Sequence, residues 1–142
     1  MKGKIFTQAE ASRAIPYLKR IATDAIASMK LIQRHGRAIA NLRADDVLSQ
    51  EEREEAIRQH EAKIEILEAR IEDCRKELEP LGCFLDDPER GIIKFYGEMD
   101  SRIVYFTWKP GEPRVAFWHP MEKTYSDRQP IDGDEMLAGN TP

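Results

Sequence analysis

The sequence predicts an α+β fold: a long antiparallel two-helix hairpin, coiled-coil-like, followed by a three-stranded antiparallel β-meander. Two long stretches carry apolar residues at helical spacing, their net charges are opposite, and three short later stretches are separated by turn-forming residues. The chain of 142 residues fits one domain over 1–131. Within it we expect the hairpin at 7–81, the meander at 91–119 and a C-terminal segment at 120–131, followed by a disordered tail at 132–142.

The first helix is expected to run from Thr7 to about residue 44. Thr7 can cap the helix, and Glu10, three residues later, completes a capping box. Pro16 lies inside this span, and because proline lacks a backbone donor it predicts a kink. Apolar or small residues then recur in steps of three and four: Ile15, Leu18, Ala22, Ala25, Met29, Ile32, Gly36 and Ile39.

The second helix is expected to begin after a turn at 45–48, where Ser49 and Glu52 form a second capping box. Pro80 and Gly82 end it. Its seam residues follow heptad spacing: Ile57, His60, Ile64, Leu67, Ile71, Cys74 and Leu78.

Charge favours pairing of the two helices. Residues 8–44 hold seven bases and two acids, and residues 49–79 hold six bases and eleven acids, so their net charges are +5 and −5. Matching the two seams layer by layer places His60 against Gly36, the seam position without a side chain. Gly36 then makes room for the imidazole, or His60 is a polar register device or a pH-sensitive group.

Two helices alone leave part of their apolar surface uncovered, and the β segment is expected to cover only one end of them. A second copy of the hairpin would complete a four-helix bundle, so we predict a homodimer through the hairpin. The flank that the second copy would cover comprises Ile21, Ile26, Leu31, Leu42 and Ile66.

The β segment is expected to form strands at about 91–96, 102–108 and 114–119, with short turn-rich connections. Alternation along the second strand puts Val104 and Phe106 on one face and Ile103 and Tyr105 on the other. Both faces are therefore apolar. One should pack on the hairpin, and the other must cover a partner subunit or a ligand.

Composition excludes several classes of function. The net charge of −4 gives no global basic field for nucleic acid, and charge on the first helix is more simply neutralised by the second. The sequence contains no run of about 18 apolar residues, so no membrane-spanning helix is predicted. Cys74 and Cys83 match no zinc or redox spacing, which predicts free thiols and a cytoplasmic protein. No phosphate-binding glycine loop or nucleophile elbow occurs, so no cofactor is predicted.

Two regions of the sequence together resemble the bacterial domain-of-unknown-function family 2203, over roughly residues 5–132. The first is the opening, with Phe6-Thr7, Glu10-Ala11 and Ile15-Pro16. The second comprises Gly82, Asp87, Gly91-Ile92, Phe95, Arg102, Val104, Trp108, Gly111-Glu112, Trp118-His119, Arg128 and Pro130-Ile131. Thr107 departs from the pattern, where a cysteine is expected, which weakens any thiol role. The resemblance implies a fold and a grouping, and no activity.

The candidate ligand site is a polar and aromatic cluster in the β segment. Histidine beside carboxylate and guanidinium groups can move protons or bind an anion, and tryptophan faces can stack a planar group. The alternative interpretation is purely structural. In it the tryptophans belong to the core, Arg128 pairs with Glu112 or Asp87, and His119 ends a strand. The cluster comprises Arg102, Trp108, Glu112, Trp118, His119 and Arg128.

The sequence contains no catalytic constellation, and His35, His60 and His119 are too far apart in the predicted fold to hold a metal. We therefore expect a non-enzymatic, dimeric interaction or scaffold protein that docks a protein partner. The alternative is a domain that binds or hydrolyses a small anionic ligand at the candidate cluster.

Overall fold

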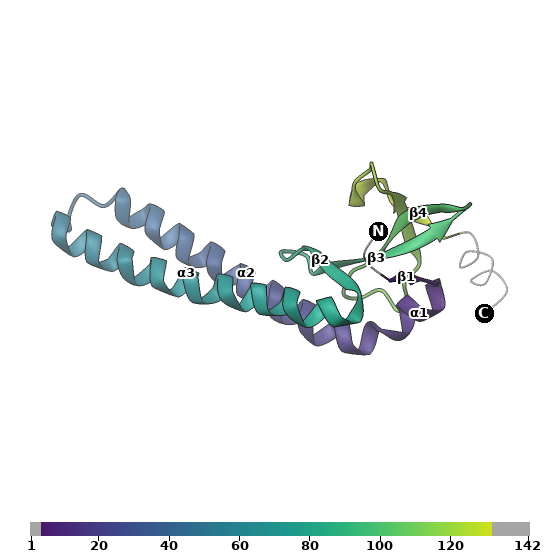
Figure 1. Cartoon of the computed structure of the whole chain (residues 1–142). Helices are drawn as coiled ribbons and strands as arrows, with labels where there is room; N and C mark the ends of the chain where they lie inside the picture. Colours follow the sequence, from purple (N-terminus) through teal and green to yellow (C-terminus); the bar gives the residue numbers. More distant parts are fainter. Residues whose placement is uncertain (1–3, 132–142) are drawn as a thin grey trace.

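The computed structural model of the chain describes residues 4–131. It is α+β, with long helices followed by a mixed sheet of several strands (Figure 1). No helix in this range is long and apolar enough to cross a membrane. The predicted tail at 132–142 lies outside the described residues. In chain order the elements are β1 (Ile5–Phe6), α1 (Gln8–Arg13), α2 (Ile15–Arg43), α3 (Gln50–Leu78), η1 (Glu79–Leu81), β2 (Cys83–Asp87), β3 (Ile92–Met99), β4 (Arg102–Trp108), β5 (Phe117–Pro120), η2 (Tyr125–Asp127) and β6 (Gln129–Pro130).

The first predicted helix is two helices. The capping box is confirmed: the Glu10 N–H donates to Thr7 Oγ1 at 3.1 Å, and the Thr7 N–H donates to the Glu10 carboxylate at 2.9 Å. However, α1 ends before Ala14 and α2 starts at Ile15. Pro16 therefore occupies the first turn of α2, where a missing N–H breaks no intrahelical bond. The predicted kink inside one helix was wrong, because the proline starts a helix instead.

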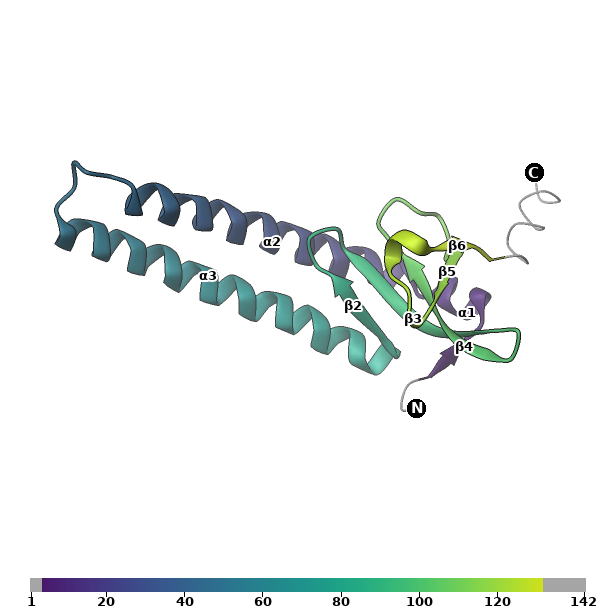
Figure 2. The same cartoon turned by 90° about the horizontal axis from the view of Figure 1, so that it is seen from above.

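The long helices α2 and α3 lie side by side along the molecule, joined by residues 44–49 (Figures 1 and 2). Each has 29 residues, which gives a length of about 44 Å at ~1.5 Å per residue. The second capping box is also confirmed, with Ser49 Oγ accepting from the Glu52 N–H at 3.1 Å. After η1 the chain turns at Gly82, whose φ of +83° is the left-handed conformation that glycine adopts without strain.

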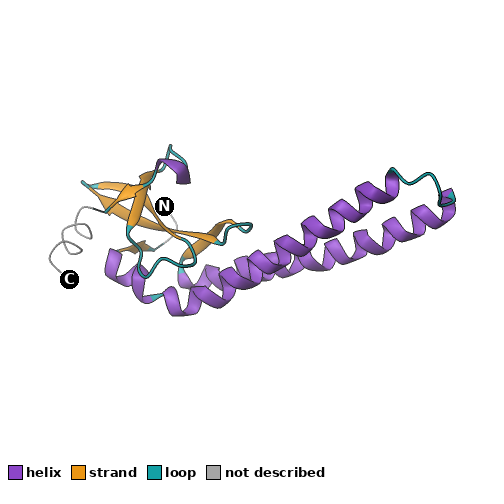
Figure 3. Ribbon diagram, turned by 180° about the vertical axis from the view of Figure 1, so that it is seen from behind, coloured by secondary structure: helices purple, strands orange, loops and turns teal. Residues whose placement is uncertain are grey.

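The sheet is built around β3. One edge of β3 pairs with β4 in antiparallel fashion, and β5 and then β6 follow in the same sense. The other edge is shared: β2 pairs antiparallel with the first half of β3, and β1 pairs parallel with Tyr96 and Gly97. Figure 3 shows the strands gathered at one end of the helix pair.

The predicted three-stranded antiparallel meander was therefore incomplete: the sheet has six strands and is mixed. The strands that the sequence did not indicate are short, and β1 and β6 have two residues each. Two residues show no alternation of apolar and polar side chains. They join the sheet because β3 and β5 offer unpaired backbone groups at their edges.

The core lies between one face of the sheet and the adjoining halves of the long helices. Val104, Phe106 and Trp108 are buried on the β4 face that turns toward the helices, as alternation predicts. Leu18 of α2 and Leu78 of α3 are fully buried against them. Beyond this region the helices project away from the sheet (Figure 1).

Part of the flank that we expected to be uncovered is covered by the β segment. Ile21 belongs to the core. Ile26 closes on Gly91, where an added Cβ would lie 2.8 Å from its Cδ1. Farther from the sheet the helices bury little, and Ile39 is the buried residue of α2 beyond Ser28. Ile66 of α3 is 58% exposed.

Candidate functional site

The six residues of the predicted ligand cluster do not form a single site. Trp108 is fully buried in the core, and its indole N–H donates to the Glu112 carbonyl at 2.9 Å. Arg102 begins the same strand and is exposed opposite Met99. Trp108 lies six positions after Arg102 along the strand, which is about 20 Å at ~3.3 Å per residue.

Trp118 and His119 are neighbours in sequence but lie on opposite faces of β5. Trp118 pairs with Phe106 and packs against the core. His119 pairs with Tyr105 on the outer face, and their ring centroids are 5.4 Å apart. The pleat of a strand forces this separation, so the two side chains cannot contact one ligand on the same face.

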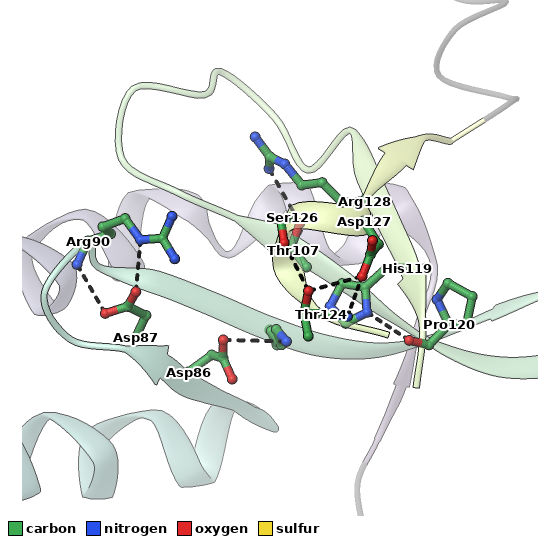
Figure 4. Close-up of polar contacts among 11 residues, drawn as sticks. Asp86, Asp87, Arg90, Thr107, His119, Pro120, Thr124, Ser126, Asp127 and Arg128 are labelled. Carbon is green, nitrogen blue, oxygen red and sulfur yellow. Dashed lines mark hydrogen bonds and ion pairs between the residues drawn. The ribbon is translucent and has the colours of Figure 1, made fainter. Parts of the chain in front are cut away.

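Glu112 and Arg128 do meet. Arg128 Nη2 lies 2.6 Å from Glu112 Oε2, and both side chains are largely buried. The guanidinium carbon is 4.2 Å from the Phe117 ring centroid and 4.3 Å from that of Tyr125. Arg128 Nη1 lies 3.4 Å from Thr107 Oγ1 (Figure 4). The pair therefore agrees with the structural interpretation, in which Arg128 binds a carboxylate instead of a ligand. Through this ion pair, Arg128 holds the C-terminal segment against the loop after β4.

The sequence-based site missed Lys94, in the middle of β3. Lys94 is 6% exposed, and its Nζ lies 3.4 Å from Asp86 Oδ2 and 4.9 Å from the Tyr105 ring centroid. The available signal was one lysine inside an otherwise apolar run, Gly91 to Tyr96. A lysine is rarely buried without a specific partner or role.

A groove follows the junction of the two long helices outside the core. One part, of about 390 Å³, is lined by Asp24, Ser28, Cys74 and Glu77 among others. The next, of about 240 Å³, includes His35, Lys63 and Ile66, and both parts share Leu31 and Arg70. The lining of the groove thus mixes apolar side chains with charged ones. The predicted dimer contact would use this surface.

Comparison with protein families gives a match over the described residues. The family model of an uncharacterised conserved protein, DUF2203, matches residues 4–131, which is nearly the whole chain. The chain belongs to the DUF2203 family. The resemblance seen in the sequence is confirmed, over almost the same span. No curated protein and no solved structure matches the DUF2203 chain.

Neither cysteine of this DUF2203 chain is suited to nucleophilic chemistry. Cys74 and Cys83 are free and buried. Burial raises the pKa of the Cys83 thiol to about 12, and burial followed by the charge of Asp24 raises that of Cys74. A thiol needs a lowered pKa to react readily.

His60 does not pack against Gly36 as the seam predicts. Its Nδ1 lies 2.8 Å from Nδ1 of His35, the neighbour of Gly36, so the two imidazoles share a hydrogen bond across the helices. Gly36 is exposed, and an added Cβ would meet nothing within 4 Å. The interpretation that Gly36 makes room for the imidazole was wrong, because the ring turns toward a polar partner.

This histidine pair is expected to make stability depend on pH. Burial, the neighbouring His60 and then Lys63 lower the pKa of His35 below its ordinary 6.5. The unfolded chain therefore takes up a proton more readily than the folded chain, so the free energy of unfolding falls as pH falls through about 6.5. Urea unfolding of the wild type between about pH 7.5 and 5.5 measures the slope.

The matched variant is His35→Gln/His60→Gln, which keeps polar side chains at both positions. Burial also lowers the pKa of His119, so some slope remains in this variant. The expected result is a shallower pH dependence than in the wild type. Identical slopes would contradict the lowered pKa of His35.

Proposed function

We propose that this DUF2203 chain is a non-enzymatic, dimeric interaction protein in which α2 and α3 dock on a second copy. The observation that carries the proposal is the groove between the two helices, whose lining includes the apolar side chains of the exposed Ile66 and of Leu31. Soluble proteins seldom leave an apolar helix surface open to water, because covering it is favourable by about 25 cal/mol per Å².

Charge supports a second copy as the occupant. Over the observed bounds, α2 holds six bases and one acid, whereas α3 holds six bases and ten acids. A two-fold axis can lay α2 of one copy on α3 of the other, which brings opposite net charges together. If α2 of one copy lay instead on α2 of the other, and α3 on α3, helices of like net charge would face each other. The charge pattern thus favours one orientation of the four helices.

Helix length is a further support. An isolated helix in water gains little from propensity alone, and its stability comes from packing of an apolar face. Here the sheet covers the near half of the pair, and the far half has few buried side chains. A four-helix bundle would supply the missing packing there. The sheets would remain at the two ends of the dimer, open to further partners.

Native mass spectrometry and light scattering of the full chain test the proposal. The wild type is expected to be a dimer, and Ile66→Glu to shift it to monomer because a charge would enter the apolar contact. The control is Val47→Glu, which adds the same charge at a 94% exposed position in the loop between the helices. Circular dichroism checks that both variants keep their helices.

A monomeric wild type at micromolar concentration would contradict the proposal. So would an Ile66→Glu variant that remains as dimeric as Val47→Glu. A dimer that both substitutions leave intact would use a surface other than this groove.

A further inference from the structure

His119 is fully buried although it lies on the outer face of the sheet. The chain leaves β5 at Pro120 and pairs with it again as β6, and the η2 segment, residues 121–127, lies between these two points. Figure 4 shows His119 beside Thr124 and Asp127 of this segment, and His119 and Asp127 each affect the pKa of the other. The η2 segment thus covers the histidine.

The two nitrogens of the His119 ring have different surroundings. Nδ1 lies 2.7 Å from the Pro120 carbonyl oxygen, which can only accept a hydrogen bond, so Nδ1 carries the hydrogen. Nε2 has no hydrogen-bond partner among the described residues and almost no accessible surface. In the neutral ring Nε2 is an unpaired acceptor. Protonation would make it a charged donor without an acceptor, which is more costly in a buried position.

Charged groups face His119 from several elements. They are Lys94 of β3, Asp86 of β2 and Asp127 of the η2 segment, and the Tyr105 ring of β4 lies against the imidazole. Burial lowers the pKa of His119 below its ordinary 6.5, and Lys94 acts in the same direction, whereas the two carboxylates oppose the shift. With the η2 segment in place, the neutral ring is therefore favoured.

Asp127 is already occupied by other hydrogen bonds. Its Oδ2 accepts from the Thr124 N–H and from Thr124 Oγ1, both at 3.0 Å. These bonds lower the pKa of Asp127 below the ordinary value for an aspartate. Asp127 therefore keeps its negative charge between about pH 7.5 and 5.5, and His119 is the group of this contact that titrates in that range.

The η2 segment is held mainly at its ends. Arg128, which follows it, forms the buried ion pair with Glu112. Within the segment the backbone hydrogen bonds are local, since the Lys123 N–H donates to the Pro120 carbonyl and the Asp127 N–H to the Thr124 carbonyl. Six of its seven residues are exposed. The segment can therefore move away from the sheet without breaking the pairing of the strands.

We propose that the η2 segment is a pH-dependent cover, which opens between Pro120 and Arg128 when His119 takes up a proton and thereby exposes His119 and Lys94 to water. In the open form the imidazolium group is hydrated, so its pKa returns to about 6.5. The population of the open form therefore rises as pH falls below about 6.5. The proposal does not depend on the oligomeric state of the chain.

Hydrogen exchange of the full chain tests the inference. After correction for the intrinsic pH dependence of exchange, the protection of the Lys123, Asp127 and Arg128 amides should fall by up to about tenfold between pH 7.5 and 5.5. This limit follows from an open-form pKa of about 6.5. The internal control is Ile131, whose N–H donates to the Ala116 carbonyl beyond Arg128 and should keep its protection.

Two variants assign the effect to one histidine. His119→Phe keeps a ring at the position but cannot take up a proton, so it should abolish the fall in protection. His35→Gln/His60→Gln removes the other two histidines and should leave the fall unchanged. If His119→Phe does not fold, the ring nitrogens of His119 in the wild type should titrate at the same pH at which protection is lost.

Three results would overturn the proposal. The first is unchanged protection of the η2 segment between pH 7.5 and 5.5, and the second is a fall that persists in His119→Phe. The third is an equal fall at Ile131, which would mean that a larger part of the chain opens.

Discussion

Replacement of Gly97 by alanine is expected to destabilise the chain by about 2–3 kcal/mol. A Cβ at this position would lie 2.4–2.6 Å from three carbons of the Phe106 ring. Phe106 is 3% exposed and belongs to the core, so its ring can move only by displacing core neighbours or toward the hollow that Met99 and Ile131 also line. Either this shift of the ring or a separation of β3 from β4 lowers the free energy of unfolding. Urea unfolding at pH 7 measures the difference in the free energy of unfolding.

The control for Gly97→Ala is Gly36→Ala. Gly36 lies in the middle of α2, and an added Cβ would meet nothing within 4 Å. Alanine forms helices better than glycine, so this variant should be more stable than the wild type by up to about 1 kcal/mol. The two substitutions thus have opposite expected signs. A neutral Gly97→Ala would show that the sheet is less tightly packed at Phe106 than described.

Replacement of Arg128 by leucine is expected to destabilise the chain by about 3 kcal/mol. The substitution leaves the largely buried Glu112 carboxylate without the guanidinium group that lies 2.6 Å away. It also removes the charge that sits over the Phe117 and Tyr125 rings. Thermal and urea unfolding measure the loss, and increased proteolysis within 121–131 would show that the C-terminal segment has detached.

A double-mutant cycle separates the ion pair from the ring contacts. Glu112→Leu/Arg128→Leu should recover part of the stability that Arg128→Leu loses, because no unpaired buried carboxylate remains. The control is Arg58→Leu, whose ion pair with Glu55 is exposed and should contribute no more than about 1 kcal/mol. Equal effects of Arg58→Leu and Arg128→Leu would mean that the contacts of Arg128 contribute little to stability.

The pairing of Arg128 with Glu112 could be proposed from residue type alone, because a guanidinium group in a folded chain seeks a carboxylate. The separation of Trp118 from His119 follows from the strand pleat once β5 is recognised. The burial of Lys94 could not be predicted from the sequence, because a lysine in a strand is ordinarily exposed and this one is buried among groups of β2, β4 and the segment around η2.

The sequence by itself determined the helix caps and the family. Capping boxes at Thr7 and Ser49 and the glycine at 82 act through bonds within a few residues of each other, so local sequence is sufficient to specify them. The tertiary structure alone decided the parallel pairing of β1 with β3, the burial of Ile21, and the meeting of His35 with His60. These features depend on groups brought together from distant parts of the chain. Their physical causes are the burial of apolar surface and the pairing of polar atoms with a hydrogen-bond partner.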